Sequence, residues 1–134
     1  MGDRAGPREG ATATGVAPPG WPKEVRPPGA LDWEATAVRW LLDVCPPDYR
    51  GYDVLRRYPV VLARFAATHL SAAVEAAREG LASVRAELRG VVPPDAIEAA
   101  VAAYEREGAR LVATARAVAL VDAALRGRRF AARL

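Results

Sequence analysis

The 134-residue sequence predicts an all-α fold, in which a long antiparallel two-helix hairpin, similar to a coiled coil, is braced by an N-terminal amphipathic helix. Apolar residues recur at alternating steps of three and four along residues 60–88 and again along residues 97–125, the spacing of a packed helical seam. A short stretch containing glycine and proline separates the two series. We expect a disordered tail at 1–29 and a helical domain at 30–134, with helices at about 32–45, 59–89 and 95–126.

The tail contains six glycines and six prolines and almost no aliphatic side chains. Such a stretch buries too little apolar surface to offset the entropy lost on ordering, so we expect it to be disordered. Within it, Trp21 lies in a run stiffened by prolines. This tryptophan either docks on a partner or touches the helical domain, and both interpretations stay open.

The first helix is expected from Asp32, a possible N-cap, to Cys45, where Pro46 and Pro47 end it. Apolar residues cover most of its circumference, so it needs two neighbours, or one neighbour and a second molecule. We expect it to pack on the end of the hairpin away from the 90–94 turn. The candidate interface residues are Trp33, Trp40, Leu41 and Val44 of the first helix with Leu62 and Phe65 of the second.

The connector at 46–58 interleaves tyrosines and arginines. This mixture is used for base stacking and phosphate contact in nucleic-acid binding. Tyrosines also pin a loop to a helix end by burying the ring, which is the interpretation we favour here. The residues of the nucleic-acid hypothesis are Tyr49, Arg50, Arg56 and Arg57, with Arg126, Arg128 and Arg129 near the C-terminus.

The hairpin has recognisable ends. Pro59 suits the first position of a helix, because its missing N–H is not needed there. Gly90 supplies a left-handed residue that ends the second helix. Asp95 and Glu98 then predict an N-cap and a capping box. With the turn centred between residues 92 and 93, facing residues should have numbers that sum to about 185.

Two sets of charged residues lie on or around this hairpin. Asp122 is the one charge in the second apolar series and should face Ala63, within reach of Arg64 or an arginine near 56 and 57. Structural pairing explains it better than a perturbed catalytic carboxylate. The outer face of the hairpin is solvated or meets another protein through charge; it comprises Glu75, Arg78, Glu79, Arg85, Glu87, Arg89, Glu98, Glu105, Arg106 and Glu107.

Composition excludes several classes of protein. One cysteine and one histidine are too few ligands for a structural zinc site, so we expect no metal and no cofactor. No uninterrupted apolar run approaches the roughly 18 residues of a membrane span, and we expect a cytoplasmic protein without a membrane partner. The net charge of +3 is concentrated in the arginines near the C-terminus.

The segment from Arg64 to His69 reads Arg-Phe-Ala-Ala-Thr-His. Its spacing resembles the Arg-x4-6-His element of HEPN ribonucleases, and the resemblance covers these six residues. It implies an all-helical dimer in which Arg64 and His69 of both chains meet at a shared cleft and act on RNA. The alternative is that His69, the only histidine, is a half-buried packing residue beneath the first helix.

The function we expect is that of a non-catalytic protein-protein interaction or scaffold module that self-associates, for example as a four-helix bundle. No catalytic residue is assigned in this interpretation. A HEPN-like ribonuclease and a nucleic-acid-associated protein are the alternatives.

Overall fold

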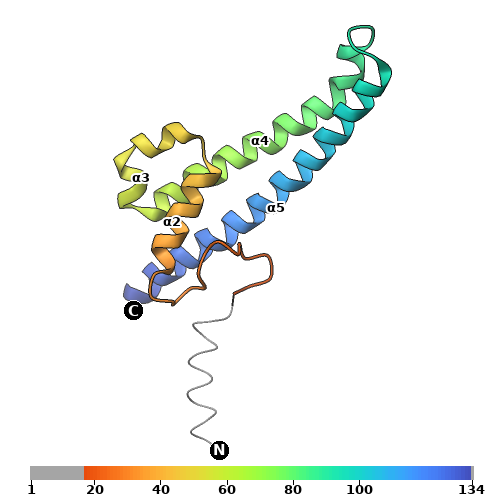
Figure 1. Ribbon diagram of the computed structural model, residues 1–134. Helices are drawn as coiled ribbons and strands as arrows, with labels where there is room; N and C mark the ends of the chain where they lie inside the picture. The colour runs from red at the N-terminus through yellow and green to blue at the C-terminus, as the bar shows by residue number, and fades with distance from the viewer. Residues whose placement is uncertain (1–16, 134) are drawn as a thin grey trace, which may run out of the picture. The chain divides into compact units, whose positions relative to one another are not determined.

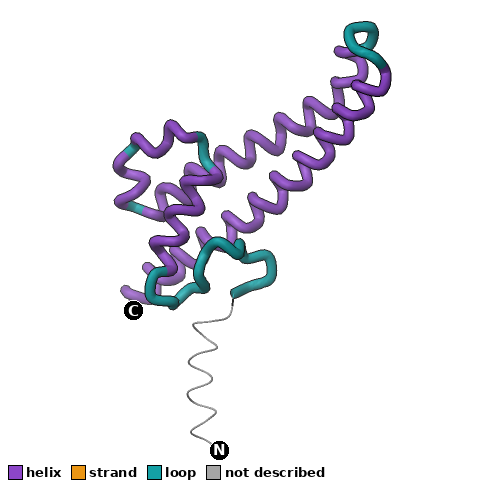
Figure 2. The backbone as a smooth tube through the Cα atoms, viewed as in Figure 1, coloured by secondary structure: helices purple, strands orange, loops and turns teal. Residues whose placement is uncertain are grey.

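The computed structural model describes residues 17–133, with side-chain surroundings described as far as Gly127 (Figure 1). This part of the chain contains helices and no strand, and short loops join the helices (Figure 2). The all-helical class and the packing of two long helices are confirmed. The elements in order are α2 (Trp33–Val44), the 3-10 helix η1 (Pro47–Gly51), α3 (Asp53–Arg57), α4 (Pro59–Leu88) and α5 (Pro94–Arg133).

The chain divides into two compact units. Among the described residues, unit 1 comprises residues 17–66 and 117–133, and unit 2 comprises residues 67–116. Helices α4 and α5 therefore each have one segment in unit 1 and another segment in unit 2.

Unit 1 has a core in which α2, α3 and the adjoining segments of α4 and α5 all take part. Each of these elements contributes at least one large side chain that is no more than 2% exposed. Burying a side chain of this kind contributes about 1.5–3 kcal/mol relative to leaving it in water. The residues are Trp33 and Leu41 of α2, Leu55 of α3, Leu62 of α4, and Val118, Val121 and Leu125 of α5.

The segment before α2 is folded against this core. The ring centroids of Trp21 and Trp33 are 6.2 Å apart, and the indole N–H of Trp21 donates to the carbonyl oxygen of Val25 at 2.9 Å. Val25 itself is only 3% exposed. Trp21 thus touches the helical domain, which is one of the two interpretations that the sequence left open.

The expectation of a disordered tail at 1–29 is therefore wrong for residues 17–29. Backbone hydrogen bonds close turns in this segment, and the N–H of Arg26 donates to the hydroxyl of Thr36 in α2 at 3.0 Å. The packing of Trp21 on Trp33, the burial of Val25 and the hydrogen bond to Thr36 help to offset the ordering cost. Trp33 and Thr36 belong to α2, and local composition does not reveal such tertiary partners. Residues 1–16 lie outside the described residues.

The connector between α2 and α4 is mostly helical. The ring of Tyr49 in η1 packs edge-on against Phe65, with centroids 5.6 Å apart, and the guanidinium of Arg50 pairs with Asp43 of α2 at 2.7 Å. These contacts hold η1 against its neighbours, so Tyr49 is a pinning residue. In α3, Leu55 points into the core while the other side chains are exposed.

Unit 2 is a pair of helix segments that pack along one seam, residues 67–88 of α4 and residues 94–116 of α5 (Figure 1). Ala67 was expected in the seam but is exposed. The other seam residues are buried or half-buried apart from Tyr104, which is 37% exposed. The buried ones, each 2–8% exposed, are Leu70, Ala77, Val84, Ile97, Val101 and Leu111.

The turn between the two segments has the expected glycine and an unexpected helix start. Gly90 has a φ of +79°, the left-handed conformation that L side chains rarely adopt. Helix α5 begins at Pro94, so Asp95 lies inside the helix. Glu98 makes no capping box, because its carboxylate pairs with Arg85 of α4.

Helix α5 is longer than expected. It continues through Arg133 instead of ending near residue 126, since Gly127 alone does not end a helix of good helix formers. The partner expected for Asp122 is corrected as well. Its carboxylate accepts two 3.0 Å hydrogen bonds from Arg126, one turn along the same helix.

By length and composition α4 is apolar enough to cross a membrane, with a mean hydropathy of 1.3 over 18 residues, a test that core helices of soluble proteins also pass. Only 28% of that window is buried within the chain. Much of the small, apolar surface of α4 is therefore open. The expectation of a cytoplasmic protein without a membrane partner stays a prediction.

Candidate interaction surfaces

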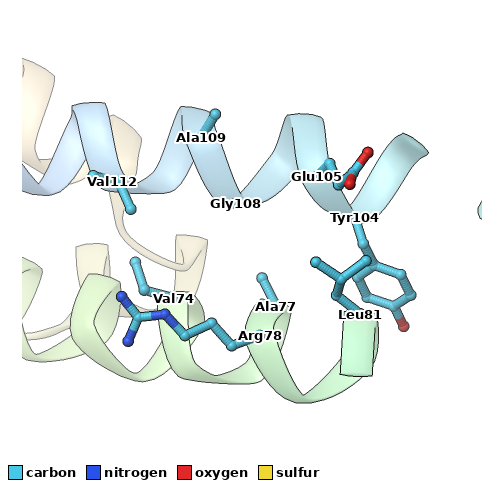
Figure 3. A pocket seen from close by; sticks show the side chains of 9 residues that line it. All are labelled: Val74, Ala77, Arg78, Leu81, Tyr104, Glu105, Gly108, Ala109 and Val112. Carbon is cyan, nitrogen blue, oxygen red and sulfur yellow. The ribbon is translucent and has the colours of Figure 1, made fainter. Parts of the chain in front are cut away.

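A groove of about 240 Å³ lies between the two helix segments of unit 2 (Figure 3). Its floor and walls are mainly apolar, with one charged residue on each helix. The lining residues are Val74, Ala77, Arg78 and Leu81 of α4 with Tyr104, Glu105, Gly108, Ala109 and Val112 of α5.

The groove is open because small residues meet in its middle. Ala77 and Gly108 line it from opposite helices and offer one methyl group between them. At one end Tyr104 fills the space instead, since its ring lies where a Cβ on Gly80 would be. Gly80 thus makes room for the tyrosine, which still remains 37% exposed.

The charged residues of the groove do not neutralise each other within the chain. The guanidinium of Arg78 pairs with Glu75 on its own helix at 2.8 Å. Glu105, on the other helix, forms no ion pair with any described residue. Both charges are exposed. The groove therefore carries a basic residue on α4 and an acidic residue on α5.

Nearer the turn, a bidentate pair joins the two helices. Arg85 donates to the two carboxylate oxygens of Glu98 at 2.9 and 3.1 Å. The hydrogen bond from Arg85 is the main cause that lowers the pKa of the Glu98 carboxyl. The pair borders a second hollow of about 380 Å³ beside the turn, lined also by Arg89, Gly90, Val92, Pro94 and Ile97.

Most of the interface residues expected from the sequence are buried within the chain. Trp33, Leu41 and Leu62 are 0–1% exposed and Trp40 is 9% exposed. The expectation that these four residues form an interface with a second molecule is therefore wrong, because they pack inside unit 1. Of the other two, Val44 is half-buried and Phe65 is 39% exposed.

Three residues of the nucleic-acid hypothesis are paired with carboxylates. Arg50 pairs with Asp43, Arg57 with Asp53 at 3.6 Å, and Arg126 with Asp122. The guanidinium of Arg57 also lies 5.9 Å from the ring centre of Tyr58. Arg56 is exposed, Tyr49 packs on Phe65, and the side chains of Arg128 and Arg129 lie outside the described residues.

The ribonuclease hypothesis concerns two residues on one continuous helix. Arg64 is exposed and His69 is half-buried. Five residues apart on a helix, their side chains leave the axis about 140° apart. Such a pair needs further groups to converge on one substrate, so the hypothesis stays a prediction.

Other chemistry finds little support among the described side chains. Burial raises the pKa of the Cys45 thiol to about 11, against a smaller opposing effect of Arg50, so this thiol is a poor nucleophile at neutral pH. In the part of the chain that the structure describes, no three His, Cys, Asp or Glu side chains gather as they would around a metal ion.

Comparison with known protein families, with characterised proteins and with solved structures yields no match. The fold and its surfaces define the class of protein: an all-helical chain with a closed core in unit 1 and an open helix pair in unit 2. The groove was not predicted as a site. The sequence contains two indications of this groove. Ala77 and Gly108 are expected to face each other, and opposite charges lie beside the seam.

Proposed function

We propose that this chain is a non-catalytic helical interaction module that self-associates through its coiled-coil-like hairpin. The observation that carries the proposal is the open apolar groove of unit 2, which has Val74, Leu81 and Val112 in its walls. Interaction modules made of helices bind other helices through such grooves, using apolar anchors on successive turns.

The physical argument concerns what two helices leave uncovered. A pair of helices buries one stripe on each partner, whereas a bundle of four buries the same stripes from two sides. Here the seam residues Val74 and Leu81 are only half-buried, and Tyr104 is exposed. A second pair of helices would remove this apolar surface from water at about 25 cal/mol per Å².

The test is the absolute molar mass of the full chain in solution, by light scattering on a sizing column at two concentrations and two salt levels. We expect a dimer, with twice the 14.3 kDa mass of one chain. A monomer at every concentration would overturn the proposal. The full chain is needed, because removing residues 17–29 would uncover Trp33.

A further inference from the structure

The charged residues of the groove specify how two copies would meet. Glu98 and Glu105 are one heptad apart on α5, and Arg85 and Arg78 are one heptad apart on α4. The pair between Arg85 and Glu98 fixes the level at which the two antiparallel helices face each other. Seven residues further along each helix, about 10.5 Å, Arg78 and Glu105 lie at one common level.

All four charges therefore lie on the same side of the helix pair. The basic ones are on α4 and the acidic ones are on α5, at two successive levels. At the level nearer the turn, Arg85 and Glu98 bind each other. At the groove, Arg78 pairs with Glu75 on its own helix, and Glu105 forms no ion pair with a described residue, although its charge, after the larger effect of Glu98, contributes to raising the pKa of Arg85.

We propose that the groove is covered by the same groove of a second copy, in a dimer whose two-fold axis runs parallel to the helices. The inference rests on the proposed self-association and names its surface. A two-fold axis makes the same contact twice, with residue i of one copy on residue j of the other and the reverse.

The direction of the axis follows from the charges. When the axis runs along the helices, α4 of each copy covers α5 of the other at the same level, so Arg78 faces the partner's Glu105 twice. When the axis runs across the helices, α4 covers α4, and arginine faces arginine while glutamate faces glutamate. Opposite charges favour the first arrangement, and like charges at an interface cost several kcal/mol.

The groove also suits a helix in size and polarity. Exposed Ala109 lines the groove one turn from Glu105 on α5, and such a short side chain lets two backbones approach. In the two-fold arrangement the apolar walls of the two copies face each other, while the ion pairs lie at the rim. Rim pairs set the orientation and partner choice more than the affinity.

The experiment uses full-length chains with single charge reversals, Arg78→Glu and Glu105→Arg, and measures the dimer dissociation constant by analytical ultracentrifugation. Each reversal places like charges at both symmetric contacts, so we expect dimerisation to weaken about tenfold or more. Mixing the two variants restores an attractive pair at both contacts. The mixture is therefore expected to form heterodimers within about threefold of the wild-type constant.

The controls separate the surface from the function. Arg106→Glu and Glu79→Arg make the same charge changes on exposed positions away from the groove, and should leave dimerisation unchanged. Far-UV circular dichroism checks that each variant remains helical. If the wild type is monomeric, the proposed function fails. If the wild type dimerises and both groove variants dimerise equally well, self-association stands and this arrangement is overturned.

Discussion

The two units of this chain use the same helices in different ways. In unit 1, segments of α4 and α5 share a core with α2 and α3, and Leu62, Val118, Val121 and Leu125 of these segments are no more than 2% exposed. In unit 2, the same two helices have only each other. Small residues such as Ala77 and Gly108 then leave a groove that none of the described side chains fills.

This difference separates stability from availability for binding. A region whose apolar side chains are fully enclosed resists local opening, whereas a region with a single seam opens at lower free energy. Unit 1 buries Trp33 and Trp40, although Leu31, Tyr52, Val54, Tyr58 and Phe65 of the same unit remain exposed. Unit 2 has an apolar groove along its single seam, so we place the interaction site there.

The largest effect expected from this comparison is a difference between two leucines. Leu41 is 0% exposed in unit 1, while Leu88 of unit 2 is half-buried near the turn and outside the groove. Leu41→Ala should lower the free energy of unfolding by about 3–4 kcal/mol, and Leu88→Ala by about 1 kcal/mol, because only the first leaves an enclosed cavity. Urea unfolding followed by circular dichroism measures both.

A volume-conserving control accompanies this pair. Leu41→Met keeps the side-chain volume and should cost less than about 1.5 kcal/mol. Equal losses for Leu41→Ala and Leu88→Ala would show that the two units are enclosed to the same degree, and the comparison would fail.

The same comparison explains which features the sequence predicted. Helix class, the starts of α2 and α4 and the left-handed Gly90 depend on local spacing, proline and glycine, and the sequence was sufficient for them. The folding of Trp21 and Arg26 onto α2 depends on tertiary partners, Trp33 and Thr36, that lie ten or more residues away. No local pattern shows such a partner, because proline-rich composition describes the segment without its neighbours.

Side-chain partners were harder to predict than helices. The sequence placed Asp122 opposite another helix, but an arginine four residues along satisfies it at less entropic cost. The capping box failed for a similar reason, since Arg85 offers Glu98 a bidentate partner. The groove results from small residues in the seam. The same pattern is expected where two helix backbones pack closely, so it did not predict an open groove.

Two glycines of unit 2 should respond differently to the same substitution. Glycine inside a helix costs about 1 kcal/mol relative to alanine. Nothing lies within 4 Å of a Cβ built on Gly108, so Gly108→Ala should stabilise unit 2 by about 0.5–1 kcal/mol. A Cβ on Gly80 would meet the Tyr104 ring, which must move and lose its contact, so Gly80→Ala should gain nothing or lose about 1 kcal/mol.

Thermal unfolding at a concentration below the dimer dissociation constant measures the stability of both variants as monomers, so dimerisation through the groove does not contribute. Tyr104→Ala provides the control, since on that background Gly80→Ala should recover the gain seen for Gly108→Ala. A stabilising Gly80→Ala in the presence of Tyr104 would show that the ring does not need the glycine.

The smallest effect concerns pH and belongs to the ion pair that joins the two helices of unit 2. The pKa of Glu98 is lowered in the folded chain, mainly by its hydrogen bond from Arg85, so folding favours the charged form. The stabilisation is fully present above the unfolded-state value near 4.5 and is lost as the pH falls through the folded value. Glu98→Gln should therefore lose less stability than the wild type between pH 6 and pH 3.

Both partners of this pair are exposed, so the effect should be small and should shrink in high salt. Glu107→Gln is the matched control, because the pKa of Glu107 is also lowered by an arginine, but by Arg110 on its own helix. Urea midpoints of the three chains at pH 6 and pH 3 make the comparison. We expect only Glu98→Gln to reduce the drop of the urea midpoint between pH 6 and pH 3, which would show that the pair between α4 and α5 stabilises unit 2. Equal changes in both variants would mean that charge within a single helix explains the pH dependence. The Arg85–Glu98 pair would then not hold the two helix segments together.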